Sequence, residues 1–195
     1  MRRVVWNVAH PFITGTEMFE LRDGSSGFVL GGWVVAMIDQ ASVAVSYEVE
    51  ADRSWLTRRV AVTVHSDDGR SLLLEHDGEG GWTVDGVPRP DLATCRDVDL
   101  GVSPSTNTLP IRRLGLEVGD RRDRDAAWVR FPLLSVEVLR QAYERLGEDS
   151  YRYSSPGFQR DLVVDDDGVV LRYGDDLWQA VLAGTQDNPR EADHP

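Results

Sequence analysis

The chain has 195 residues, a hydrophobic content of 41% and a formal net charge of −12. This length suffices for a sizeable core, and the composition is that of a globular chain rather than a disordered or fibrous one. The negative charge argues against nucleic acid and anionic membrane surfaces as partners, because both carry charge of the same sign.

The cysteine count and the hydrophobic stretches indicate the cellular compartment that we expect for the protein. Cys95 is the only cysteine, so there is no intramolecular disulfide framework. The N-terminal run MRRVVWNVAH has no apolar signal core, and the weakly polar stretch 27–38 is too short to span a bilayer. We therefore expect a cytoplasmic protein without integral membrane association.

Short alternating runs separated by Asp-Gly pairs dominate the chain. Residues 43–50 and 60–65 alternate between apolar and polar side chains, as half-buried strands do. Asp-Gly pairs, which favour tight hairpin turns, stand at 23–24, 68–69, 77–78, 85–86 and 167–168. The pattern predicts an all-β or nearly all-β fold, with a mostly antiparallel sheet that forms a barrel or a strongly curled roll.

The segment 133–146 fits two structures. Its sequence, LLSVEVLRQAYERL, contains good helix formers at helical spacing, but Val136 and Val138 also suit a strand. A short helix within 133–147 and strands there both remain open on this pattern. We expect a single domain over residues 1–183, followed by a disordered polar tail at 184–195.

The segment 97–116, DVDLGVSPSTNTLPIRRLGL, is the richest in chemistry. If 109–118 is a strand, Arg112 shares a face with Leu114 and Leu116. A guanidinium on an apolar face needs a carboxylate, a phosphate or a sugar oxygen. The partner can be a ligand or an internal acid such as Asp99.

Arg58 repeats this geometry at the head of the apolar face of 60–64, so both arginines could line one partly apolar cavity. The alternative is that each stem is buried and each charged head lies in water.

Two further groups of residues are candidates. Thr106, Asn107 and Thr108 form a polar loop that could hydrogen-bond a head group, or a turn whose side chains satisfy their own backbone. A tryptophan in a β-rich domain can fill the core or contact a ligand; of the six here, Trp55 and Trp82 lie beside turns, so they are the two that we expect at the rim of a site.

Signals for catalysis and metals are weak. The histidines and aspartates at 65–77 match no metal-ligand spacing, and the chain has no lysine, no nucleophile elbow, no phosphate-binding glycine loop and no dinucleotide fingerprint. Asp97 and Asp99 could act as an acid/base pair or could neutralise an arginine. We expect no metal and no cofactor.

The run from Asp97 to Leu100, Pro104 and the core 106–114, TNTLPIRRL, resemble the bacterial glycolipid-binding family. Further matches are Tyr47, 55–58 and 81–82 in the first half, and 141–145, 151–153, 164–173 and Trp178 in the second.

The resemblance implies a spiral β-roll or half-barrel, similar to lipoprotein carriers that hold acyl chains in a concave sheet, and it favours strands over helix in 133–146. It also implies head-group contacts for these residues: Trp55, Asp99, Thr106, Asn107, Thr108, Arg112 and Arg113.

The function that we expect is non-catalytic binding of a small amphiphile, a glycolipid, in a concave cavity of the sheet. Two alternatives stand beside it. One is an enzyme that acts on a lipid-like or sugar-like substrate with an aspartate base. The other is a protein-interaction module that presents an exposed apolar patch.

Overall fold

The computed structural model describes residues 1–38, 41–65 and 69–181. Fifteen strands form one sheet in the order β8-β7-β6-β5-β4-β3-β2-β1-β15-β14-β13-β12-β11-β10-β9. The strands of the first half are β1 (Arg2–His10), β2 (Ile13–Asp23), β3 (Gly27–Ile38), β4 (Ala41–Asp52), β5 (Thr57–Val64), β6 (Arg70–His76), β7 (Trp82–Val84) and β8 (Val87–Pro88).

The second half begins with two short helices that flank a strand: η1 (Pro90–Leu92), β9 (Cys95–Leu100) and η2 (Ser105–Asn107). The remaining elements are α1 (Thr108–Leu114), β10 (Arg121–Arg130), β11 (Ser135–Arg145), β12 (Ser150–Ser155), β13 (Phe158–Val164), β14 (Val170–Tyr173) and β15 (Gln179–Ala180). No described helix is long and apolar enough to cross a bilayer.

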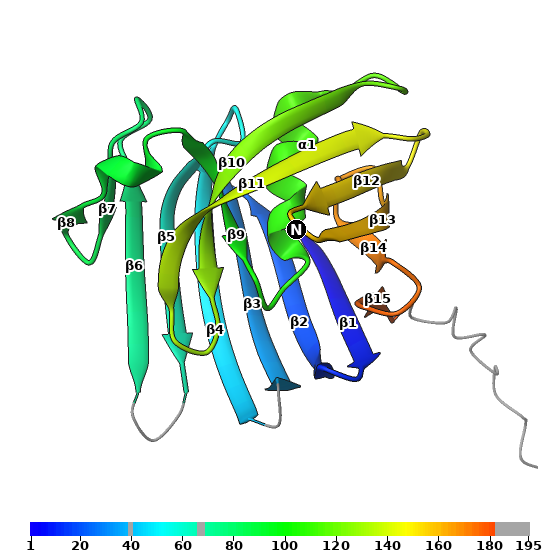
Figure 1. Ribbon diagram of the computed structural model, residues 1–195, viewed down its shortest axis with the longest axis horizontal. Coiled ribbons are helices and arrows are strands. Elements are labelled where there is room, and N and C mark those ends of the chain that lie inside the picture. The colour runs from blue at the N-terminus through cyan, green and yellow to red at the C-terminus, as the bar shows by residue number, and fades with distance from the viewer. Residues whose placement is uncertain (39–40, 66–68, 182–195) are drawn as a thin grey trace, which may run out of the picture.

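The sheet curls on itself without closing. Strands β1–β6 form one curved layer, and β10–β14 cross it as a second layer with α1 between them (Figure 1). Within the described residues β9 and β10 pair in parallel, and the other paired strands are antiparallel. The predicted curled antiparallel sheet is therefore confirmed.

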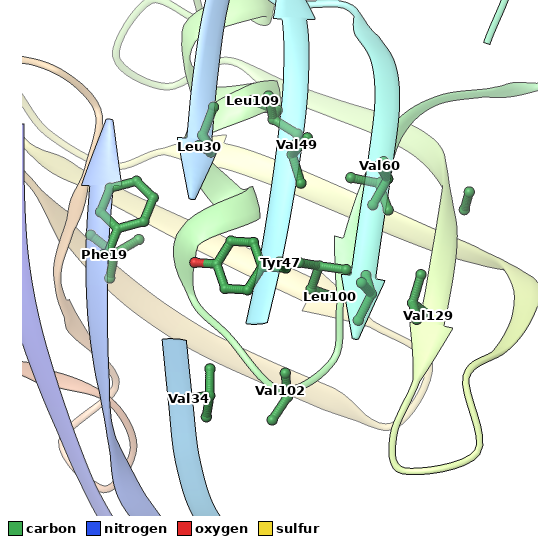
Figure 2. Packing of buried hydrophobic residues seen from close by; sticks show 14 of the residues in the cluster. Phe19, Leu30, Val34, Tyr47, Val49, Val60, Leu100, Val102, Leu109 and Val129 are labelled. Carbon is green, nitrogen blue, oxygen red and sulfur yellow. The ribbon is translucent and has the colours of Figure 1, made fainter. Parts of the chain in front are cut away.

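The core fills the space between the two layers. Figure 2 shows Leu30, Val49 and Val60 of the first layer facing Leu109 of α1 and Val129 of β10, and all five are buried. Along β4 the burial alternates residue by residue, as the sequence pattern predicted. The inward side chains of both layers thus share one core.

The turns largely follow the predicted Asp-Gly pairs. Those at 23–24, 77–78, 85–86 and 167–168 join consecutive antiparallel strands. At 85–86 both residues have positive φ, 49° and 78°, which is the conformation that suits a tight hairpin. Asp68 and the predicted tail at 184–195 lie outside the described residues.

The structure settles two segments for which the sequence pattern left the secondary structure open or conditional. The segment 133–147 holds no helix, because Ser135–Arg145 forms β11 and pairs with β10 and β12. The strand predicted at 109–118 is wrong, because Thr108–Leu114 is the helix α1. Pro110 is tolerated in its first turn, and Gly115 ends it with φ 53° in the left-handed region.

Candidate functional site

A cavity of about 600 Å³ lies at the end of the β1–β2 hairpin, where the second layer crosses the loop after β9. Apolar and aromatic side chains form much of its wall, among them Phe12, Ile13, Leu139, Phe158, Leu177 and Trp178. Polar side chains also line it: Asp99, Ser103, Asn107 and Tyr153. This combination of apolar and polar walls with this volume is typical of small-molecule binding sites.

Asp99 on β9 is the acid of the cavity. It is half-buried, and its Oδ2 accepts hydrogen bonds from Gln141 Nε2 on β11 and from the Tyr153 hydroxyl on β12, the latter at 3.4 Å. Burial raises the pKa of Asp99 to about 6, although both hydrogen bonds oppose the rise. At neutral pH Asp99 is therefore mostly ionised and serves as a hydrogen-bond acceptor in the cavity wall.

Asn107 also lines the cavity. Its Oδ1 accepts a hydrogen bond of 2.8 Å from the Tyr143 hydroxyl, and its Nδ2 donates one of 2.9 Å to the Pro104 carbonyl. These bonds fix the amide at the point where η2 meets α1. Tyr143 and Tyr153 also contact each other edge to face, with ring centroids 5.4 Å apart.

A buried acid lies behind Ser103. The Ser103 hydroxyl donates a 2.7 Å hydrogen bond to Glu17 Oε1 on β2, which also accepts one from Tyr47 on β4. Figure 2 shows the Tyr47 ring reaching from β4 toward the side of β2 that carries Phe19. Glu17 is fully buried, and its Oε2 has no partner among the described residues. Burial raises the pKa of Glu17 to about 8, so this carboxyl is mostly protonated at neutral pH.

A family model described as "Putative glycolipid-binding" matches residues 3–180. The chain belongs to the putative glycolipid-binding family. A crystal structure of a DUF1089 family protein from Pseudomonas aeruginosa is 32% identical to this member, with a TM-score of 0.74. That alignment covers 82% of this chain and 90% of the other. The chain matches no curated protein.

Of the nine predicted site residues, the cavity of this glycolipid-binding family member brings together Asp99 and Asn107. Thr106 and Thr108 flank Asn107 in the chain, but they are buried away from the cavity and are not among the residues that line it. The Thr106 hydroxyl accepts a 3.2 Å hydrogen bond from the backbone N–H of Leu100. The Thr108 hydroxyl has no hydrogen-bond partner among the described residues.

The three predicted arginines contact protein groups. Arg113 makes a two-pronged ion pair with the buried carboxylate of Asp97, and Arg58 pairs with Asp52 at 2.9 Å. Arg112 lies on α1 rather than on a strand, and donates to the Asp166 carbonyl at 3.0 Å. The predicted pairing of Asp99 with Arg58 or Arg112 is wrong, because the Asp99 carboxylate accepts hydrogen bonds from Gln141 and Tyr153 instead.

Arg112 borders a separate hollow of about 590 Å³. Charged side chains of both signs dominate its wall, including Arg145, Glu148, Asp149 and Asp165. Such a wall offers little to an apolar tail, so this hollow suits an amphiphile less well than the cavity does.

The predicted rim positions of Trp55 and Trp82 are wrong, because both side chains are buried. Trp55 stacks on Phe28 with centroids 3.8 Å apart and lies under the Arg112 guanidinium. Trp82 stacks on His76 and donates to the Cys95 carbonyl at 3.1 Å.

Sequence reasoning missed Glu17, Ser103 and most of the aromatic wall. One signal for Glu17 was present, since it shares strand parity with Phe19 and Leu21 in 13–23. The cavity wall comes from six separate stretches of the chain, at 10–13, 99–107, 128, 139, 153–158 and 173–178, and has no local signature. Among the described residues, no group of three or more His, Cys, Asp or Glu side chains could hold a metal ion.

Proposed function

We propose that the protein binds an amphiphilic ligand of the glycolipid class in the 600 Å³ cavity, without catalysing a reaction. The observation that carries the proposal is one wall that combines aliphatic and aromatic side chains with Asp99, Asn107 and Tyr153. Apolar side chains would hold the tail, because burying apolar surface drives such binding. The polar groups would orient the head.

The charge of the wall favours a neutral, hydroxylated head group. None of the residues that line the cavity in the described chain is an arginine, although the protein has 21 basic residues. Asp99 would repel a phosphate or sulfate, whereas a sugar hydroxyl can donate to its carboxylate. Membership of a family described as putative glycolipid-binding agrees with this choice.

The first test is native mass spectrometry of the purified protein, followed by lipid extraction and a binding titration. We expect the wild type to carry or to bind a glycolipid. Leu139→Glu should abolish this binding, because it would place a charge in the apolar wall. Val138→Glu is the matched control, since Val138 is exposed on the other face of the same strand. Equal binding by both variants would place the ligand elsewhere.

The second test addresses the head group. Asp99→Asn should weaken binding of a neutral glycolipid roughly 10- to 100-fold, because hydrogen bonds to charged groups contribute about 1.5–3 kcal/mol. A lipid with the same tail and a phosphate head should bind the wild type less well than the glycolipid does. Tighter binding of the phosphate lipid by the wild type would contradict a neutral head group.

A further inference from the structure

The side of the first layer that points away from the core carries several exposed apolar side chains. Val5, Met18, Trp33, Val35 and Met37 are between 43% and 59% exposed, and all point away from the core. The strand register makes them one patch: Val5 lies opposite Met18, and Met18 lies opposite Trp33. Exposed apolar residues scattered singly are ordinary, but a contiguous patch marks an interaction surface.

The positions between these residues carry no charge. Thr16 pairs with Val35, Thr14 with Met37, and Ser46 with Trp33. Among the described residues of β1–β4, charges on this face begin one row away, where Glu20 pairs with Arg3 and Glu48 with Arg22. We call the three uncharged rows, which run from Val5, Asn7 and Ala9 on β1 across to β4, the outer face.

A hollow of about 330 Å³ lies on the outer face beside Trp33. Its wall includes Val35, Met37, Ala44 and His65. His65 also stacks on Trp33, with centroids 5.0 Å apart, so the projecting indole and the hollow are neighbours. A projection next to a recess on one surface is the arrangement that a two-fold dimer requires, because each copy can fill the recess of the other.

We propose that the outer face is a homodimer interface, in which a two-fold axis places Trp33 of each copy in the hollow of its partner. Tryptophan is among the residues that are enriched at the energetic centres of protein interfaces. Small side chains such as Thr16, Ser42 and Ala44 let the facing sheets of two copies approach to about 10 Å, as the layers of a β-sandwich do.

The charge around the outer face favours a second copy over a lipid surface. Surfaces that bind membranes surround their apolar side chains with lysine and arginine. Here the bordering row holds Glu20 and Glu48, each neutralised by an arginine, and the chain has no lysine. A bilayer would gain no electrostatic attraction from this face, whereas another uncharged sheet needs none.

The size of the outer face sets the expected affinity. Three rows over four strands cover roughly 400 Å² per copy, from a strand spacing of about 4.8 Å and a side-chain repeat of about 6.8 Å. Standard interfaces bury about 800 Å² per partner. The dimer should therefore be weak and should dissociate on dilution.

Analytical ultracentrifugation over a wide range of protein concentration tests the proposal. We expect a reversible monomer–dimer equilibrium for the wild type. Trp33→Glu should raise the dissociation constant roughly 30-fold or more, the usual effect of losing an anchor residue. Val29→Glu is the matched control, because Val29 points outward from the same strand but lies beyond the outer face, opposite Arg22 and Glu50.

Circular dichroism checks that each variant folds, and Val35→Arg replaces Trp33→Glu if the latter does not. A wild type that stays monomeric at every concentration would overturn the proposal, as would equal effects of the variants at 29 and 33. Binding of the monomer to phosphatidylcholine vesicles through Trp33 would also overturn it, since the outer face would then meet lipid. These outcomes do not depend on whether the cavity binds a glycolipid.

Discussion

Glu17 occupies a position where the alternation of β2 calls for an apolar side chain. Its neighbours on the inward face, Phe19 and Leu21, are buried with it. Tyr47 and Ser103 satisfy one carboxyl oxygen, and burial favours the neutral acid. Ionising Glu17 inside the core costs free energy, so the free energy of unfolding should depend on pH through this residue.

We predict that Glu17→Gln removes a pH dependence of stability. The pKa of Glu17 rises from 4.5 to about 8 on folding, so the folded chain holds the extra proton between these values. Its contribution to stability is complete below pH 4.5 and is lost as the pH rises through 8, by at most about 1.4 kcal/mol per pH unit.

Urea unfolding of the wild type and the variant between about pH 5 and pH 8 measures this slope. Glu20→Gln is the control, because Glu20 lies on the outer side of the same strand and pairs with Arg3. The same slope in the wild type and in Glu17→Gln would contradict the prediction.

The adjacent arginines of α1 should differ sharply in their contribution to stability. Arg113→Met leaves the buried carboxylate of Asp97 without its partner, which costs about 3–5 kcal/mol. Arg112→Met removes an exposed guanidinium 5.4 Å from the Trp55 ring, which costs about 0.5–1 kcal/mol. Urea unfolding curves give both values, and a loss at 112 as large as the loss at 113 would refute this assignment.

At the scale of elements, the end of α1 depends on the glycine at position 115. Gly115 has φ 53°, and a Cβ there would meet no atom within 4 Å. The cost of a side chain at 115 is therefore one of backbone conformation and not of packing.

We predict that Gly115→Ala destabilises the fold by about 1–2 kcal/mol, the cost of the left-handed conformation for an L-residue. Gly31→Ala on β3 is the control, since the nearest atom to a Cβ there is the Tyr47 carbonyl oxygen at 3.7 Å. That replacement should be neutral or stabilising by up to about 1 kcal/mol. Thermal unfolding of both variants tests the difference, and a neutral Gly115→Ala would show that the turn after α1 adapts.

Sequence patterns gave the strands where polar and apolar side chains alternate cleanly, as in β4, and where Asp-Gly pairs set the turns. They failed for α1, because TLPIRRL is one short run in which helical and strand spacing cannot be distinguished. Asp99 and Asn107 were found because they belong to the motif at 97–114. Phe12, Leu139 and Trp178 were not, because only the crossing of the two layers brings them together.

At the scale of the whole molecule, the order of the strands is almost purely sequential. Within the described sheet, only β1 and β15 are neighbours that do not follow each other along the chain. Two paired positions, Trp6 with Ala180 and Asn7 with Gln179, make up this seam. The Trp6 indole strengthens it with a 2.6 Å hydrogen bond to the Val170 carbonyl.

We predict that the seam forms after the folding transition state. Trp6→Phe deletes this hydrogen bond, so it should speed unfolding and leave the folding rate nearly unchanged, with a φ-value near 0. Val45→Ala, between the locally connected strands β3 and β5, should instead slow folding. Stopped-flow chevron plots measure both rates, and a φ-value for Trp6→Phe as high as that for Val45→Ala would show that the seam nucleates folding.

The sheet has two free edges, and β9 forms one of them. Two of its backbone N–H groups, those of Val98 and Leu100, donate to the hydroxyls of Thr57 and Thr106. An open edge strand offers such groups to any other extended chain, which is how fibrils grow. In this protein the two hydroxyls take up these N–H groups inside the core, because both threonines and both donor residues are buried. A valine at either position would leave a buried backbone N–H without a partner, at a cost of about 1–3 kcal/mol.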